Sequence, residues 1–276
     1  MADATPNFIE LDDPEHGRRR IASLSIPGRG DGRPGLIWLP GLKSDMASTK
    51  AEALAQWAAT QGLALARFDY SGHGQSGGEF TEATIGLWLA DTSGIFERLT
   101  QGPQIVIGSS MGGWIALRLL QELAAAGCAD RIASLLLIAP AWDMTERLMW
   151  DQMPDAARRE MQATERWLRP SAYSPEPYVI TRKLIMEGRR HLLSHRALPK
   201  HCPIRIIHGL RDEDVPFDGS LELMQRLPGA DIQISPVSDG EHRLSRPEDI
   251  ALMIEVLNRL IEHFRSTRST DHGIGS

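Results

Sequence analysis

The sequence predicts an α/β fold, in which helices cover both faces of a mostly parallel sheet. Short, continuous apolar runs at 35–40, 63–68 and 132–139 are typical of strands that are buried on both faces of such a sheet. Amphipathic helix patterns at 47–60 and 84–99 lie between these runs. Since strand and helix patterns alternate along the chain, we expect neighbouring strands to be parallel and connected through helices.

The remaining parts of the chain extend this pattern. The runs 8–11 and 21–26 alternate apolar and polar residues, as half-exposed antiparallel strands do. The C-terminal part continues the alternation of strand and helix, with elements expected at 203–209, 219–227, 231–237 and 247–264.

Residues 142–200 differ in character from the rest of the chain. Helical patterns dominate this segment, which holds three of the seven tryptophans and five of the ten methionines. We therefore expect a helical lid insertion at 142–200 within a core formed by residues 1–141 and 201–264. The polar end, 265–276, is expected to be a disordered tail.

Composition and charge exclude several functional classes. The 276 residues are 42% hydrophobic and 24% charged, as in an ordinary soluble globular protein. The net charge is −6, and no basic stripe is present that would neutralise nucleic-acid phosphates. No apolar run approaches the ~20 residues that a transmembrane helix needs. We therefore expect neither a nucleic-acid partner nor a transmembrane segment.

The two cysteines and the N-terminus indicate a compartment. Cys128 and Cys202 are far apart and form neither a disulfide framework nor a metal-binding spacing. The N-terminal residues are acidic and lack the features of a signal or transit peptide. A reducing cytoplasm is the location that this pattern predicts.

The segment 105–113, with sequence IVIGSSMGG, predicts a nucleophile. An apolar strand pattern leads into Gly108-x-Ser110-x-Gly112, and an apolar helix pattern follows directly. At so sharp a turn, side chains at the two glycine positions would collide with the neighbouring strand or helix. The turn presents the Ser110 hydroxyl above the edge of the sheet, where it can attack a substrate.

A serine hydroxyl needs a base and an acid to become nucleophilic, and two later loops supply candidates. His242 lies in the loop after the strand at 231–237, and Asp212 and Asp214 follow the strand at 203–209. Because the carboxyl ends of parallel strands meet at one edge of a sheet, these loops are expected to lie beside Ser110. His208 and His73 fit structural roles better, and the other histidines lie in the insertion or near the chain ends.

The order serine, acid, histidine resembles that of the α/β-hydrolase superfamily. The spacing Gly209-x-x-Asp212-x-x-Val215-Pro216 is similar to the family pattern and favours Asp212 as the acid, with Asp214 as the alternative. The resemblance also implies an oxyanion hole formed by backbone N–H groups. Met111 follows the nucleophile and supplies the first group. Gly41 occupies the usual glycine of the second loop, which points to the Leu42 N–H.

Within the superfamily, whole phrases of the sequence resemble the mitochondrial palmitoyl-protein thioesterase and acyl-glucuronide esterase subgroup. The resemblance spans roughly 34–260. It includes 40–46 with Thr49-Lys50, as well as 67–76, 102–114 and 202–209. Two departures are Pro40, where a histidine is usual, and Gly240-Glu241, which separate His242 from the preceding Ser-Asp pair.

The resemblance implies a serine hydrolase that cleaves acyl thioesters or esters, S-acylated proteins or peptides among them, without a metal or organic cofactor. A carboxylesterase that acts on small esters or acyl glucuronides is the alternative, and a catalytically silent binding module is a further one. The methionines and tryptophans of the insertion form either a flexible apolar wall for a medium or long acyl chain or ordinary packing of lid helices.

Overall fold

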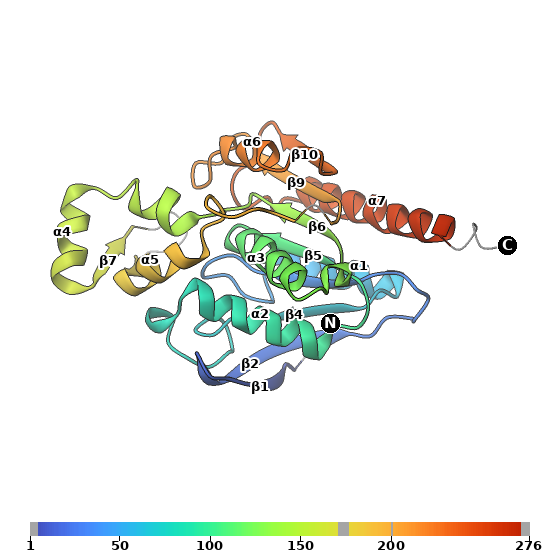
Figure 1. Cartoon of the computed structure of the whole chain (residues 1–276), viewed down its shortest axis with the longest axis horizontal. Helices are drawn as coiled ribbons and strands as arrows, with labels where there is room; N and C mark the ends of the chain where they lie inside the picture. The colour runs from blue at the N-terminus through green and yellow to red at the C-terminus, as the bar shows by residue number, and fades with distance from the viewer. Residues whose placement is uncertain (1–4, 171–176, 200, 272–276) are drawn as a thin grey trace.

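The computed structural model describes residues 5–170, 177–199 and 201–271, with side chains to residue 267. Within this part of the chain, eight strands form one sheet in the order β1-β2-β4-β3-β5-β6-β9-β10 (Figure 1). The pairs β1–β2 and β2–β4 are antiparallel, and all other neighbours are parallel. The strands are β1 (Asn7–Asp13), β2 (Gly17–Ile26), β3 (Gly35–Leu39), β4 (Leu65–Phe68), β5 (Gln104–Ser109), β6 (Ile132–Ile138), β9 (Ile204–Gly209) and β10 (Ile232–Val237).

Helices cover both faces of this sheet (Figure 1). One face packs against α1 and α7, and the other packs against α2, α3 and α6. The helices of the core are α1 (Thr49–Gln61), α2 (Ile85–Leu99), α3 (Met111–Ala125), α6 (Asp218–Gln225) and α7 (Pro247–Asp271). The predicted α/β-hydrolase fold, with a mostly parallel sheet between two helical layers, is therefore confirmed.

Alternation along each strand explains why both faces are apolar. Leu36 and Trp38 pack into the cluster that contains α1 and α7. Ile37 and Leu39 point the other way, into the cluster that contains α2 and α3. Successive side chains of a strand project to opposite faces, so a strand covered on both sides must be apolar at every position. All five residues of β3 are buried.

The segment between β6 and β9 lies beyond one end of the sheet (Figure 1) and contains strands as well as helices. A π-helix at Thr145–Trp150 is followed by α4 (Asp155–Thr164), β7 (Arg166–Arg169), β8 (Tyr178–Thr181) and α5 (Arg182–Gly188). β7 and β8 pair in antiparallel fashion. The insertion was expected to be helical, and the structure differs at these two strands, because the aromatic and β-branched run of β8 favours extended backbone.

The C-terminal helix is longer than the sequence pattern indicates. α7 continues through Asp271, whereas the pattern ends the helix at 264 and assigns 265–276 to a disordered tail. Neither glycine nor proline occurs between Phe264 and Asp271, so nothing in this stretch terminates the helix. The rest of the predicted tail, 272–276, lies outside the described residues.

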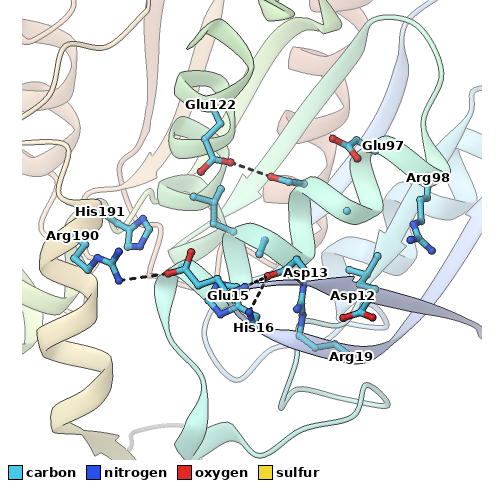
Figure 2. A pocket seen from close by; sticks show the side chains of 16 residues that line it. Asp12, Asp13, Glu15, His16, Arg19, Glu97, Arg98, Glu122, Arg190 and His191 are labelled. Atoms are coloured by element: carbon cyan, nitrogen blue, oxygen red, sulfur yellow. Dashed lines mark hydrogen bonds and ion pairs between the residues drawn. The ribbon is translucent and has the colours of Figure 1, made fainter. Parts of the chain in front are cut away.

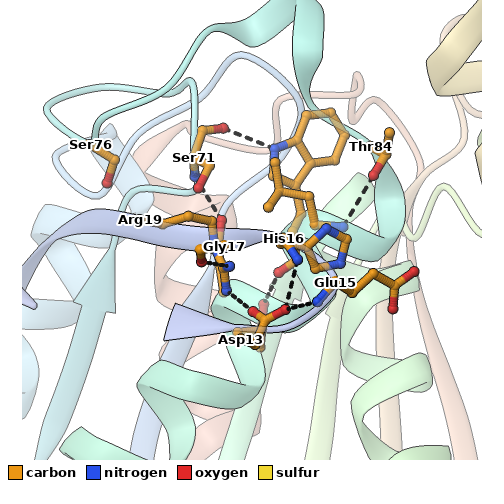
Figure 3. A network of polar contacts seen from close by, with 12 residues as sticks. Asp13, Glu15, His16, Gly17, Arg19, Ser71, Ser76 and Thr84 are labelled. Carbon is orange, nitrogen blue, oxygen red and sulfur yellow. Dashed lines mark hydrogen bonds and ion pairs between the residues drawn. The ribbon is translucent and has the colours of Figure 1, made fainter. Parts of the chain in front are cut away.

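A buried ion-pair network fastens the β1–β2 hairpin to α2 (Figure 3). Arg19 Nε donates to Asp91 Oδ1 at 2.8 Å, and Arg19 Nη2 lies 2.6 Å from Asp13 Oδ2. The Ser71 amide donates to the second Asp91 oxygen at 2.8 Å. The Asp91 side chain is fully buried, so its charge depends on these partners.

We predict that Arg19→Met lowers the free energy of unfolding by about 3–5 kcal/mol, because it leaves the Asp91 carboxylate buried without its counter-ion. Urea denaturation followed by circular dichroism measures this change. The matched control is Arg18→Met, since the Arg18–Glu10 pair is exposed and its loss has little effect. Equal destabilisation by both variants would contradict a structural role for the buried network.

Candidate active site

Ser110 lies at a strained turn between β5 and α3. Its backbone has φ 54° and ψ −118°, a combination that residues other than glycine rarely adopt. A Cβ atom on Gly108 would come within 2.4 Å of the Gly112 carbonyl oxygen. On Gly112 it would come within 2.1 Å of the Leu39 carbonyl oxygen. The glycines therefore allow α3 to start directly against β3 and β5, with Ser110 at the bend.

His242 faces Ser110 from the loop after β10. Its Nε2 atom lies 3.0 Å from Ser110 Oγ, which is within hydrogen-bond distance. On the other side of the ring, Nδ1 lies 2.8 Å from Asp212 Oδ2. The loop after β9 and the loop after β10 thus bring the predicted acid and base together beside the predicted nucleophile.

The Asp212 carboxylate is buried and held by several donors. Oδ1 accepts hydrogen bonds from the Asp214 amide at 3.0 Å and the Val215 amide at 2.8 Å. Burial by itself raises the pKa of Asp212, but hydrogen bonds from His208, His242 and the Val215 amide lower it more. The pKa of Asp212 therefore lies well below its usual range, and the residue is ionised. Asp214, the alternative acid, contributes its backbone to this arrangement.

His208 supports the acid from behind. It is fully buried on β9, with Nδ1 2.7 Å from Ser220 Oγ and Nε2 2.9 Å from the Val215 carbonyl oxygen. Nε2 also lies 3.4 Å from Asp212 Oδ2. His208 therefore has the structural role expected from the sequence. It also contacts Asp212, and its ring helps to fix the loop that carries this residue.

Two backbone N–H groups are available for an oxyanion. Met111 is the first residue of α3, where amides have no partner within the helix. Leu42 lies in the loop after β3, and the preceding Gly41 packs against Ser110, since a Cβ atom there would be 3.3 Å from Ser110 Cβ. Within the described residues, neither the Leu42 nor the Met111 amide donates a hydrogen bond to the protein.

His73 supports the loop that carries Leu42. Its Nε2 atom accepts the Lys43 N–H at 3.0 Å, while Nδ1 lies 3.3 Å from the Ser71 carbonyl oxygen. The imidazole must therefore be neutral, with its proton on Nδ1. Burial lowers the pKa of His73 to about 4. The sequence indicated a structural hydrogen bond here, but the partner, an amide next to Leu42, depends on the tertiary structure.

A pocket of about 270 Å³ opens beside Ser110 and His242. Met144, Leu148 and Met149 form its apolar side. Met144 and Met149 also belong to the hydrophobic core cluster, together with the other methionines and tryptophans of 142–167 such as Met153 and Trp167. Packing of the insertion onto the core therefore accounts for all of these residues, and a role as an acyl-chain wall stays a prediction for the three that line the pocket. Four cationic residues also line the pocket: Lys43, Lys50, Arg169 and Arg243.

A second cavity, of about 420 Å³, shares no lining residue with this pocket (Figure 2 shows the residues that line the second cavity). Its wall is formed by the β1–β2 turn, α2 and the end of the insertion, and charged side chains dominate it. Arg190 forms an ion pair with Glu15 across it at 3.5 Å. Ser110, Asp212 and His242 do not line this cavity, so the chemistry predicted from the sequence belongs to the smaller pocket.

The topology, the serine at the strand-to-helix turn and the facing histidine and acid define an α/β-hydrolase. Residues 36–184 match the family described as "Serine aminopeptidase, S33" (Hydrolase_4), which is more than half of the chain. The chain belongs to this family of hydrolases.

Individual relatives agree with the family and with the subgroup that the sequence motifs indicated. The palmitoyl-protein thioesterase ABHD10, mitochondrial, of Pongo abelii is 36% identical over 83% of this chain and 73% of its own length. A protein from Agrobacterium vitis S4 superimposes with a TM-score of 0.89 at 40% identity, covering 93% of this chain and 98% of that one. Mouse alpha/beta hydrolase domain-containing protein 10 gives 0.81 at 32% identity, covering 93% and 99%.

The same comparison corrects the predicted location. The curated relatives carry the word mitochondrial in their names, which contradicts the cytoplasmic location expected from the sequence. The prediction rested on composition and on two unpaired cysteines. Several compartments keep thiols reduced, so these features do not separate the cytoplasm from an organelle.

Across residues 5–170, 177–199 and 201–271, no helix is both long enough and apolar enough to cross a membrane. The same residues include no group of three or more His, Cys, Asp or Glu side chains that could hold a metal ion.

We predict that His73 makes the protein sensitive to acid. Because the folded pKa of about 4 lies below the usual 6.5, the unfolded chain binds the proton first as the pH falls. Stability is therefore lost between pH 6.5 and 4, by roughly 3 kcal/mol from this residue. Urea denaturation at several pH values measures the loss, and His73→Gln reduces it.

The control for this experiment is His195→Gln, because His195 is exposed on the insertion. Its pH dependence should match that of the wild type. An unchanged slope in His73→Gln would show that the Lys43 contact does not require a neutral imidazole.

Proposed function

We propose that this hydrolase cleaves acyl thioesters or esters through an acyl-enzyme intermediate, with Ser110, His242 and Asp212 as its catalytic triad. The observation that carries the proposal is the 3.0 Å distance between Ser110 Oγ and His242 Nε2 at the strained turn before α3. Relatives named palmitoyl-protein thioesterases support the thioester as the substrate class.

In the first step, His242 Nε2 takes the proton of the Ser110 hydroxyl while Oγ attacks the acyl carbonyl carbon. The carbonyl oxygen becomes an oxyanion, which the Leu42 and Met111 N–H groups stabilise. Asp212 accepts the Nδ1–H and stabilises the imidazolium. The bond to the leaving group then breaks, and His242 gives its proton to the departing thiolate or alkoxide.

In the second step, water replaces the leaving group. His242 removes a proton from this water, whose oxygen attacks the acyl-serine carbonyl, and the same N–H groups stabilise the second oxyanion. The ester bond to Ser110 breaks, Oγ recovers the proton from His242, and the carboxylic acid is released.

A carboxylesterase that acts on small esters is the second candidate, and the size of the pocket favours it. A volume of about 270 Å³ lies just below the ~300–1,000 Å³ typical of sites for drug-sized ligands. The wall formed by Met144, Leu148 and Met149 suits the first part of an acyl chain. Unbranched methionines adapt their shape, so the wall can accommodate chains of different lengths.

We predict that Ser110→Ala lowers kcat by at least about 10⁴-fold and abolishes labelling by a fluorophosphonate probe. Asp212→Asn lowers kcat by about 10⁴-fold, because the imidazole loses the acceptor that fixes its orientation. Hydrolysis of nitrophenyl esters and of acyl-CoA measures both effects.

The matched control is Asp214→Asn, which leaves the backbone donor to Asp212 in place. We expect its kcat to stay within about tenfold of the wild type. A larger loss in Asp214→Asn than in Asp212→Asn would assign the acid to Asp214, and labelling of Ser110→Ala would contradict the assignment of the nucleophile.

We predict that kcat/KM rises with acyl chain length by about fourfold per methylene until the apolar wall is covered, since burying a methylene contributes ~0.8 kcal/mol. Matched series of thioesters and oxygen esters from two to sixteen carbons measure this. Leu148→Trp fills part of the pocket and moves the plateau to shorter chains. A preference for acetyl together with no thioester turnover would rule out the thioesterase assignment in favour of the small-ester candidate.

A further inference from the structure

Lys50 is buried at a place where a cation is costly. It is the second residue of α1 and is 9% exposed. The positive end of the helix dipole disfavours a cation in the first turn, and burial removes the ammonium group from water. Burial, as the main cause, lowers the pKa of Lys50 to about 8. A residue buried at such a cost is a candidate for function.

The contacts of Lys50 explain what it does. Its Nζ atom donates to the Arg243 carbonyl oxygen and lies 3.3 Å from Ser245 Oγ. Ser245 Oγ also donates to the Arg243 carbonyl at 2.9 Å. Arg243 directly follows His242, so the ammonium group binds the backbone one residue from the proposed base. This contact joins α1 to a loop almost 200 residues later in the chain.

An ion pair between Arg246 and Asp239, at 2.8 Å, joins the two ends of the loop that carries His242, and the Leu244 side chain is buried in the core. Leu244 has φ 41°, so the backbone turns sharply after Arg243 in a conformation unfavourable for leucine. The hydrogen bond between the Leu244 amide and the Glu241 carbonyl oxygen is long, at 3.3 Å. A charge-assisted hydrogen bond from Lys50 to the Arg243 carbonyl oxygen, which lies between Glu241 and Leu244, holds this turn.

We propose that Lys50 is a positioning residue that holds the loop 241–245 so that the His242 imidazole faces Ser110. This inference rests on the proposed function, because it assigns His242 as the base. Asp212 orients the ring from its Nδ1 side, whereas Lys50 fixes the backbone from which the ring extends. Both Lys50 and His242 line the pocket, so the lysine acts from within the site.

Other charged groups surround the ammonium group. Arg243, on the same loop, lowers the pKa of Lys50, and Asp249, on α7, raises it. Asp214, His242 and Lys43 line the same pocket. The net effect of the surroundings disfavours the charged form. Replacing Lys50 with an apolar residue of similar length therefore removes an unfavourable burial together with the contact to the loop.

The test is Lys50→Met, followed by kcat, KM, fluorophosphonate labelling and stability. We expect kcat and the labelling rate to fall together by about tenfold to hundredfold, because a small displacement of the base is enough for such a loss. KM should change by less than threefold. The free energy of unfolding at pH 7 should stay the same or rise, and any gain should shrink as the pH rises from 8 to 10.5, where the wild-type lysine loses its charge.

A merely structural lysine gives the opposite result, with lower stability and unchanged kcat. That outcome, or a wild-type labelling rate in Lys50→Met, would overturn the proposal. Lys50→Arg keeps a cationic donor and should recover part of the lost kcat. If Lys50→Met does not fold, Ser245→Ala removes one partner of Nζ and should lower kcat to a smaller extent; an unchanged kcat there would count against the proposal.

Wild-type labelling separates this proposal from the function on which it rests. If the wild type is labelled at Ser110 and Lys50→Met behaves like it, only the role of Lys50 is wrong. If the folded wild type is neither labelled nor active on any ester or thioester, the proposed function itself is wrong.

Discussion

The close contact between β3, β5 and the start of α3 is the constraint on which the site depends. The backbones approach so closely at Gly108 and Gly112 that a single Cβ atom would force them apart. This contact holds Ser110 in a backbone conformation that costs about 1–3 kcal/mol, and the buried layers on both sides offset that cost. The Ser110 amide donates to the Ile138 carbonyl at 2.8 Å, so β6 also fixes the turn. Ser110, the proposed nucleophile, is therefore positioned by the sheet itself.

The other groups of the site reach Ser110 because parallel strands end at a common edge. The loops after β3, β9 and β10 contribute the Leu42 amide, Asp212 and His242, respectively. Each loop has its own support: His73 for the first and His208 for the second, and we assign Lys50 to the third. The support comes each time from a buried group that binds a backbone or carboxylate atom. Rigid strands and loops held by hydrogen bonds together fix the positions of the site residues before a substrate binds.

Local patterns predicted most of the core and the loops that meet at Ser110, whereas single contacts between other distant segments could not be predicted. The apolar run of β3 and the Gly-x-Ser-x-Gly turn carry their signals within a few residues, and the sheet then determines that Asp212 and His242 meet. The contact between Lys50 and the Arg243 carbonyl has no local signal, although a lysine in the first turn of an amphipathic helix is a weak indication. Strand β8 was missed because helical periodicity and β-branched composition compete in so short a run.

The strand order also leaves two edges, and each is unsuited to pairing with another sheet. At one edge, β1 carries three carboxylates, and Arg98 Nη1 donates a hydrogen bond to the Glu10 carbonyl oxygen at 2.7 Å. At the other, Pro236 in β10 has no N–H to offer. Exposed edges with free N–H and C=O groups are the usual starting points for aggregation. Crowded copies of this protein therefore find few partners for edge-to-edge association, even though the central strands β3, β5 and β6 are buried and largely apolar.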